Sequence, residues 1–331
     1  MICKILAAFL VSACSCFAQG MVQVKAAGTI SSQKIVVEPG VSLEVLDWGG
    51  TGRPVVLLSG LGDDAHEFDA FAPRLANHYH VYGISRRGFG KSDTPPGPYF
   101  ANRLGDDVIG VLDALKLIRP VLVGHSIAGE ELSSIGSRFP DRVAGLVYLE
   151  AGYPYALYDS KLGDVDIDTA VVLRAMQTLT SSPVPEEQHT AVKQLIQDLP
   201  RYVQELQTLD QRMQNAPKLS REQTEALRRQ ATSRESKSVT AVSLGAMRFS
   251  GVRCPVLAIF AVPHDQGIPA GAARDAADAA DLKETGAQAD AFQAANPQAT
   301  VIRIAHANHR VFQSNEPDVL RAMQTFIASL P

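Results

Sequence analysis

The segment from Val121 to Glu130 constrains the fold of this chain more than any other part. It reads Val-Leu-Val-Gly-His-Ser-Ile-Ala-Gly-Glu, so a short apolar run stops at Gly124 and a serine, Ser126, follows two residues later. A helical pattern that ends at Pro140 comes next. A serine on a sharp turn from strand to helix needs small neighbours, because its backbone is strained and the helix passes close to the strand. The segment therefore predicts a nucleophile elbow at Ser126, with Ala128 where a second glycine is usual.

Short apolar runs and helical patterns alternate along most of the remaining chain. The runs expected to be strands are 34–37, 43–46, 55–59, 81–85, 121–124, 143–149, 255–260 and 300–304. The expected helices are 65–76, 104–117, 128–139, 270–295 and 319–330. The first two strands are expected to pair in antiparallel fashion. Alternation of this kind predicts an α/β fold, in which a mostly parallel sheet is covered by helices on both faces.

The block 153–250 departs from this alternation. It is rich in Gln, Glu and Arg, and its helical spacing leaves no convincing strand. One apolar stripe precedes Pro200 and a second follows it, so we expect the helix to break there. The stripes consist of Val192, Leu195, Ile196 and Leu199, and of Val203, Leu206 and Leu209. Because sheet-like sequence resumes afterwards, we expect a helical lid inserted into a core domain formed by 19–152 and 251–331. A separate helical domain is the alternative.

The first residues have the pattern of an export signal. Lys4 precedes the apolar run 5–11, which is too short to span a bilayer, and nothing later resembles a membrane span. Cleavage after Ala18 would remove a signal peptide, 1–18, and release a periplasmic or secreted protein. A lipobox ending at Cys14 would instead give a membrane-anchored lipoprotein. A cytosolic protein with an apolar N-terminal helix is the third interpretation.

Charge and cysteine content exclude several classes of protein. The formal net charge is −4 and there is no basic block, so nucleic acid is not an expected partner. No cluster of His and Cys has the spacing of metal ligands, so no metal site is expected. After cleavage at Ala18 only Cys254 remains, and no intrachain disulfide can form.

A serine hydroxyl is a weak nucleophile and needs a base that is itself oriented by a carboxylate. Asp265 and His309 each follow an expected strand, and the carboxyl ends of parallel strands converge on one crevice. The chain order Ser126, Asp265, His309 therefore predicts a catalytic triad. Glu150, which directly follows the run 143–149, is the alternative acid.

The other histidines and two arginines are expected to have structural roles. His306 competes with His309 for the role of base but lies nearer the strand, and His125 beside Ser126 is interpreted as packing. Loop or surface positions are expected for His66, His189 and His264. Arg86 and Arg87 are expected to bind backbone carbonyls or carboxylates.

The chain resembles the α/β-hydrolase superfamily, in its lid-bearing esterase-like branch, over nearly its whole length after the leader. The elbow around Ser126 is one of the matching motifs. Segment 57–63 resembles the oxyanion loop after the third strand, with Ser59 where the family usually has His. Segment 85–92 matches the Arg-Gly-x-Gly-x-Ser loop after the fourth strand, and 308–317 matches the histidine loop and last helix.

The resemblance implies a serine hydrolase that cleaves carboxylic esters of small molecules through an acyl-enzyme, without metal or organic cofactor. The backbone N–H groups of Leu61 and Ile127 would form the oxyanion hole. Tyr153 and Tyr155 come shortly after Glu150, beyond the end of the expected strand 143–149. They are expected either to line the substrate pocket or to pack within the lid.

The fold admits other chemistry. The same triad could serve an amidase, a lactonase, a carbon–carbon bond hydrolase or a perhydrolase. A ligand-binding protein of this fold with slow turnover is a further alternative. Haloalkane dehalogenases and epoxide hydrolases are disfavoured, because their nucleophile is Asp where this chain has Ser126.

Overall fold

The computed structural model describes residues 30–215, 220–222, 224–225 and 234–331. The expected signal peptide, 1–18, and the alternative lipidation site, Cys14, lie outside the described residues and stay predictions. In the described part of the chain, no helix is both long enough and apolar enough to cross a membrane.

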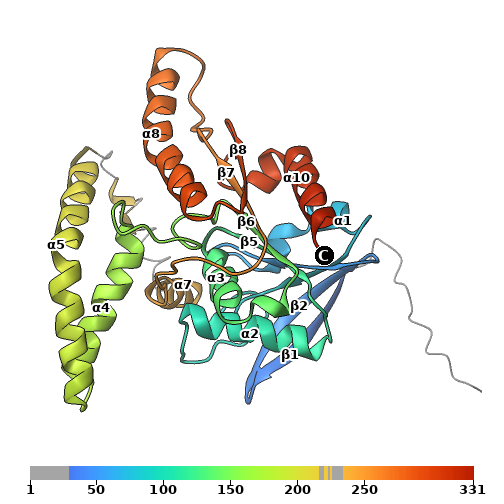
Figure 1. Cartoon of the computed structure of the whole chain (residues 1–331), viewed down its shortest axis with the longest axis horizontal. Coiled ribbons are helices and arrows are strands. Elements are labelled where there is room, and N and C mark those ends of the chain that lie inside the picture. Colours follow the sequence, from blue (N-terminus) through green and yellow to red (C-terminus); the bar gives the residue numbers. More distant parts are fainter. Residues whose placement is uncertain (1–29, 216–219, 223, 226–233) are drawn as a thin grey trace, which may run out of the picture.

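One eight-stranded sheet forms the centre of the molecule, in the strand order β1-β2-β4-β3-β5-β6-β7-β8 (Figure 1). Strand β2 pairs in antiparallel fashion with both β1 and β4, and the remaining neighbours are parallel. The strands are β1 (Ser31–Glu38), β2 (Val41–Gly49), β3 (Pro54–Leu58), β4 (His80–Ile84), β5 (Val121–His125), β6 (Gly145–Leu149), β7 (Val256–Ala261) and β8 (Thr300–Ile304). Every expected strand has its observed counterpart, and the predicted mostly parallel sheet is confirmed.

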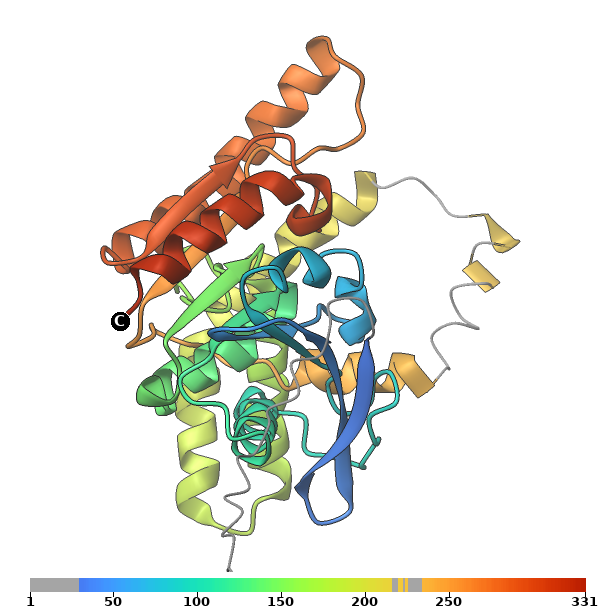
Figure 2. The same cartoon turned by 90° about the vertical axis from the view of Figure 1, so that its right-hand side faces the viewer.

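Helices cover both faces of this sheet (Figures 1 and 2). On β5, Leu122 packs into one core with α2 and α3, whereas Val121 and Val123 pack into a second core with α1 and α10. This follows from the alternation of side chains along a strand. The helices are α1 (Ala72–Leu75), α2 (Ala101–Ala114), α3 (Gly129–Arg138), α8 (Ala272–Ala295), α9 (Val311–Ser314) and α10 (Glu316–Ser329).

The expected helix 65–76 is broken into two short pieces. A 3-10 turn, Ala65–Phe68, comes first, and α1 follows after three residues. Pro73 lies in the first turn of α1. Proline has no backbone N–H to donate and is favoured at a helix start, so one continuous helix through this position is disfavoured.

The block between β6 and β7 is helical, as predicted, and contains α4 (Val165–Ser181), α5 (Pro185–Asn215) and α7 (Arg234–Leu244). Helices α4 and α5 lie side by side (Figures 1 and 2) and share a small apolar core. The expected break at Pro200 is wrong, because α5 continues through it. Of the first stripe, Leu195 is buried, whereas Ile196 is exposed, as are three residues of the second stripe, Val203, Leu206 and Leu209.

Candidate active site

Ser126 lies at the apex of a sharp turn between β5 and α3. Its φ of 53° is in the left-handed region, which a non-glycine residue adopts at a cost of about 1–3 kcal/mol. A Cβ added at Gly124 would lie only 2.9 Å from the side chain of Leu132, so the helix does pass close to the strand. This is the strand–turn–helix geometry that the sequence predicts.

His309 follows β8 and lies against the residue that precedes Ser126. The Nε2–H group of His125 donates to the backbone oxygen of His309 at 3.1 Å, and the two imidazole centroids are 4.8 Å apart. The His309 side chain is 57% exposed and therefore accessible from outside. Within the described structure, no hydrogen bond joins Ser126 to His309; in hydrolases such a bond often tightens only when substrate is bound.

The carboxylate of Glu150 lies at the inner nitrogen of His309. Its Oε2 is 3.6 Å from Nδ1 of His309, and its Oε1 accepts a hydrogen bond from the backbone N–H of Ala261. Burial alone would raise the pKa of Glu150, but the hydrogen bonds with His264 and Ala261, together with the nearby His309 imidazole, hold it below its usual value. Glu150 directly follows β6, the neighbour of β5, so Glu150 and Ser126 come from adjacent strands.

The expected acid, Asp265, lies elsewhere. Its backbone N–H donates to Ala307 at 2.8 Å, and its exposed carboxylate accepts from the backbone N–H of Gly267 at 2.9 Å. A short Asp side chain that closes its own turn in this way is not free to reach a neighbouring loop. Asp265 has no contact with His309 among the described residues. The carboxylate that lies near this histidine is that of Glu150, the alternative acid.

His264, for which the sequence predicts a surface or loop position, is the closest side-chain partner of Glu150. Its Nε2 lies 2.7 Å from Oε2 of Glu150, and its Nδ1 lies 3.1 Å from Oδ2 of Asp281 on α8. The hydrogen bond with Glu150 raises the pKa of His264 to about 9, against an opposing effect of burial and with further help from Asp281. Nothing in the linear sequence connects these three residues. His306, by contrast, lies near Asp278 at 3.9 Å.

The oxyanion loop packs against the elbow. A Cβ added at Gly60 would lie 2.9 Å from Nδ1 of His125 and 3.6 Å from Cβ of Ser126, so only glycine fits this approach. Leu61 follows in a turn, and its backbone N–H donates to no acceptor among the described residues. Ile127 follows Ser126 directly and is buried. Both expected donors therefore belong to segments that lie beside Ser126.

The predicted structural roles of Arg86 and Arg87 are confirmed. The Arg86 guanidinium pairs with Glu131 and donates to the backbone oxygen of Ser59 at 3.0 Å, which supports the oxyanion loop. Arg87 pairs with Asp107 at 2.5 Å in the interior of the core. Neither guanidinium is available to bind a substrate anion.

One buried carboxylate, Glu67, contacts the oxyanion loop, the end of β5 and the histidine loop. Its Oε2 accepts from the backbone N–H of Gly60 at 3.1 Å, and its Oε1 lies 2.9 Å from Nδ1 of His125 and 3.2 Å from Nε of Arg310. Burial alone would raise the pKa of Glu67. Its pairing with His125 and its other hydrogen bonds outweigh this effect and hold the pKa below its usual value. Glu67 and His125 are each 2% exposed. No sequence pattern singles out Glu67, which lies among the polar residues of an expected helix.

Tyr153 and Tyr155 lie between the core and the helical block. The Tyr153 hydroxyl donates to the backbone oxygen of Gly163 at 2.7 Å. Tyr155 packs both with the cluster around Ile127 and with the cluster around Ile167 on α4. Tyr155 therefore joins an expected oxyanion residue to the inserted helices.

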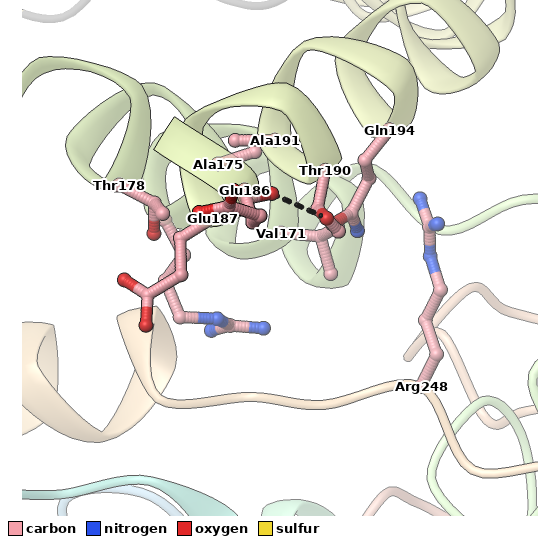
Figure 3. Close-up of a pocket in the computed structure, with 10 residues that line it drawn as sticks. Val171, Ala175, Thr178, Glu186, Glu187, Thr190, Ala191, Gln194 and Arg248 are labelled. Carbon is pink, nitrogen blue, oxygen red and sulfur yellow. Dashed lines mark hydrogen bonds between the residues drawn. The ribbon is translucent and has the colours of Figure 1, made fainter. Parts of the chain in front are cut away.

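A cavity of about 610 Å³ lies inside the helical block, between α4 and α5 (Figure 3). Arg248, on the segment after α7, points toward it, and Thr190 on α5 donates to the backbone oxygen of Glu186 at its rim. Ser126, Glu150 and His309 do not line it. The cavity is thus distinct from the place where Ser126, Glu150 and His309 lie.

The titratable groups near Ser126 pair with one another. No group of three or more His, Cys, Asp or Glu in the described ranges is arranged to hold a metal ion. Glu150 pairs with two histidines and Glu67 with one, and each is hydrogen-bonded to backbone N–H as well.

Curated relatives match this chain over part of its length. A putative carbamate hydrolase of Caulobacter segnis is 37% identical over 111 residues, which cover 33% of this chain and 42% of the relative. Epoxide hydrolase A of Mycobacterium tuberculosis is 34% identical over 122 residues, which cover 36% of this chain and 38% of the relative. The chain thus spans about four-tenths of the length of these relatives.

Solved structures match over most of the chain, at an identity that shows the fold alone. An E-2-(acetamidomethylene)succinate hydrolase superposes with a TM-score of 0.56 at 18% identity, covering 91% of this chain and all of that one. A thermophilic esterase from Thermogutta terrifontis superposes with a TM-score of 0.56 at 20% identity, covering 90% of this chain and 98% of the esterase. The sequence model described as the alpha/beta hydrolase family matches residues 55–322. With its elbow, oxyanion loop and histidine loop in place, the chain belongs to the alpha/beta hydrolase family.

Proposed function

We propose that this hydrolase cleaves carboxylic esters through an acyl-enzyme, with Ser126 as nucleophile, His309 as base and Glu150 as the acid of the triad. One observation carries the proposal. An ionised, buried carboxylate lies at Nδ1 of His309, and the backbone of that histidine is hydrogen-bonded to the neighbour of a strained Ser126.

The reaction follows from these positions. His309 accepts the proton of the Ser126 hydroxyl as that oxygen attacks the ester carbonyl, and Glu150 stabilises the resulting imidazolium. His309 then protonates the leaving alcohol when the tetrahedral intermediate collapses to the acyl-enzyme. Water attacks the acyl-enzyme with His309 as base, which releases the acid and restores Ser126.

The negative oxygen of each tetrahedral intermediate needs hydrogen-bond donors. The contact of Gly60 with the elbow supports the backbone N–H groups of Leu61 and Ile127 as these donors. An aimed donor of this kind contributes about 3–4 kcal/mol to the transition state. Because the donors belong to the backbone, the serine at position 59 does not prevent the loop from acting.

An ester is favoured over the other substrates for which relatives are named. The similar epoxide hydrolase is matched over only part of its length. Epoxide hydrolases of this family are expected to use an aspartate as nucleophile at the elbow. This chain has a serine, Ser126, at that position. Amide, carbamate and lactone bonds can be cleaved by the same acyl-transfer chemistry. The experiment must therefore compare ester hydrolysis with the hydrolysis of such bonds.

The test uses matched substrates with one acyl group, such as p-nitrophenyl butyrate, butyranilide and a butyrolactone. We expect a burst of p-nitrophenol equal to the enzyme concentration, and a butyryl adduct on the peptide that contains Ser126 in a quenched digest. The ester should have a larger kcat/KM than the anilide or the lactone. Turnover without an adduct on Ser126, or a preference for the anilide or the lactone, would contradict the proposal.

We further propose that the inserted helices limit the acyl group, with Tyr155 at the boundary. Replacing Tyr155 with alanine should open space beside Ile127 and shift the preferred p-nitrophenyl ester by two or more carbons toward longer chains. Tyr153→Phe is the matched control, because it removes only the hydroxyl bond to Gly163 and should keep the wild-type profile. The measurement is kcat/KM across esters of two to twelve carbons. An unchanged profile for Tyr155→Ala would assign this residue to packing alone.

A further inference from the structure

A second histidine and a second carboxylate stand behind the proposed triad. His264 lies in the loop after β7, with its ring between Glu150 at the end of β6 and Asp281 on α8. The Nε2–Oε2 distance to Glu150 is 2.7 Å, and the Nδ1 distances to the two Asp281 oxygens are 3.2 and 3.1 Å. The backbone N–H of His264 also donates to Oδ2 of Asp281 at 2.8 Å. The His264 side chain is 24% exposed, so solvent reaches only part of it.

Donor and acceptor chemistry fixes the charge of this ring. An ionised carboxylate can only accept hydrogen bonds, whereas a neutral imidazole has one donor and one acceptor nitrogen. Because each nitrogen of His264 faces a carboxylate, both must carry a proton, and the ring is an imidazolium. The pKa of His264, raised to about 9 chiefly by the bond with Glu150, agrees with this arrangement at neutral pH.

The same carboxylate oxygen serves both histidines. Oε2 of Glu150 is 2.7 Å from Nε2 of His264 and 3.6 Å from Nδ1 of His309, while Oε1 is held by the backbone of Ala261. Of the two histidines, His264 is therefore nearer to the Glu150 carboxylate and interacts with it more strongly. It fixes where Oε2 points, and its positive charge offsets part of the negative charge that His309 meets.

We propose that His264 is a positioning residue for the hydrolytic reaction: held as a cation between Asp281 and Glu150, it orients the Glu150 carboxylate toward His309 and weakens the attraction of that carboxylate for the His309 proton. The proposal rests on the triad given above. It adds a role for a residue that needs no contact with the substrate.

The consequence concerns the charge that acts on His309. The groups that face His309 are Glu150 and the ring of His125, and those that face His264 are Glu150 and Asp281. Removing the cation at His264 leaves the full charge of Glu150 to act on His309. A nearby opposite charge favours the protonated imidazole, so His309 would then lose its proton at a higher pH.

The test is the pH profile of kcat/KM on one p-nitrophenyl ester for the full chain and its His264→Gln variant. The acid limb reports the protonation of the base in the free enzyme. We expect this limb to move upward by about one pH unit in His264→Gln, together with a loss of about tenfold in kcat/KM at its plateau from the freed carboxylate. A variant that merely loosens the loop would lose activity with an unmoved limb, and that result would overturn the proposal.

Two further variants separate charge from shape. His264→Lys keeps the positive charge, so its acid limb should stay within a few tenths of a unit of wild type even if its rate falls. His306→Gln removes a histidine from the adjacent loop that has only a 3.9 Å contact with Asp278, and it should match wild type in both limb and rate. If His264→Gln does not fold by circular dichroism, Asp281→Asn tests the same charge: it removes one anion while the bond with Glu150 keeps the ring cationic, so the acid limb should move downward, and an upward shift would contradict the proposal.

Stability against pH gives an independent readout of the cation. A histidine whose pKa is raised on folding adds stability that is fully present below its unfolded value of about 6.5 and is lost as pH rises through about 9. The wild type should therefore lose its stability advantage over His264→Gln between these pH values in urea titrations. An advantage that does not change with pH would show that the ring is neutral and would overturn the proposal.

Failure of this proposal and failure of the triad give different results. If Glu150→Gln cripples the enzyme but His264→Gln leaves the acid limb in place, the triad stands and the role of His264 is rejected. If Glu150→Gln is active, the acid assignment itself is rejected, and with it the reason for His264 to matter.

Discussion

Replacing Ser126 with alanine is expected to lower kcat/KM for p-nitrophenyl esters by at least about 10⁴-fold, because no other group in the proposed mechanism can form the acyl-enzyme. The fold should survive, since alanine fits the same space and adopts the same φ of 53° with similar strain. A fluorophosphonate probe should label the wild type and leave Ser126→Ala unmodified.

Ser137→Ala is the matched control for this substitution. Ser137 lies on α3, and its hydroxyl donates to the backbone oxygen of Gly251 at 3.0 Å, so its loss touches no part of the site. We expect this variant to keep both turnover and labelling. Labelling of Ser126→Ala at the wild-type rate would place the nucleophile at another residue.

The second large effect concerns the acid, and here the structure reverses the ranking that the sequence suggests. Glu150→Gln keeps the shape of the side chain but removes the charge at Nδ1 of His309 and favours the wrong tautomer. We expect kcat/KM to fall on the order of 10³- to 10⁴-fold, which is the effect that the corresponding amide substitution has in the triad of serine proteases. Asp265→Asn should cost less than about tenfold, since its carboxylate is exposed and bonded within its own turn.

Both variants should be measured on one activated ester at the pH optimum, with folding verified by thermal unfolding. A crippled Asp265→Asn beside an active Glu150→Gln would restore the acid to the loop after β7. Equal losses in the two variants would mean that the loop of Asp265 and the position of Glu150 depend on each other, and the assignment to Glu150 alone would then be withdrawn.

The sequence predicts the layered architecture well, because the sheet and its covering helices depend on local patterns. Continuous apolar runs identify the parallel strands, and the small residues around Ser126 identify the elbow. Pro73 and Pro200 show where local signals mislead. Near a helix start proline helps to begin a new helix, whereas inside the long α5 the neighbouring backbone bonds and the packing against α4 outweigh the one bond that is lost.

Which carboxylate lies beside His309 could not be predicted, because it depends on the conformations of two loops. Both Glu150 and Asp265 follow a strand that ends at the catalytic edge, so strand position alone does not separate them. The outcome is decided by the turn that Asp265 closes with Gly267, and by the ring of His264, which takes the place facing Glu150. The contact of His264 with Glu150 joins residues 114 positions apart, and no short pattern encodes it.

The buried carboxylate of Glu67 has a consequence for how the molecule loosens. It contacts Gly60 in the oxyanion loop, His125 at the end of β5 and Arg310 in the histidine loop, so none of these segments can move outward without losing a contact with a buried charge. Independent fraying of one of the two loops is therefore disfavoured, because both are tied through Glu67 to the end of β5. Local opening at Glu67 is expected to release the oxyanion loop and the histidine loop together.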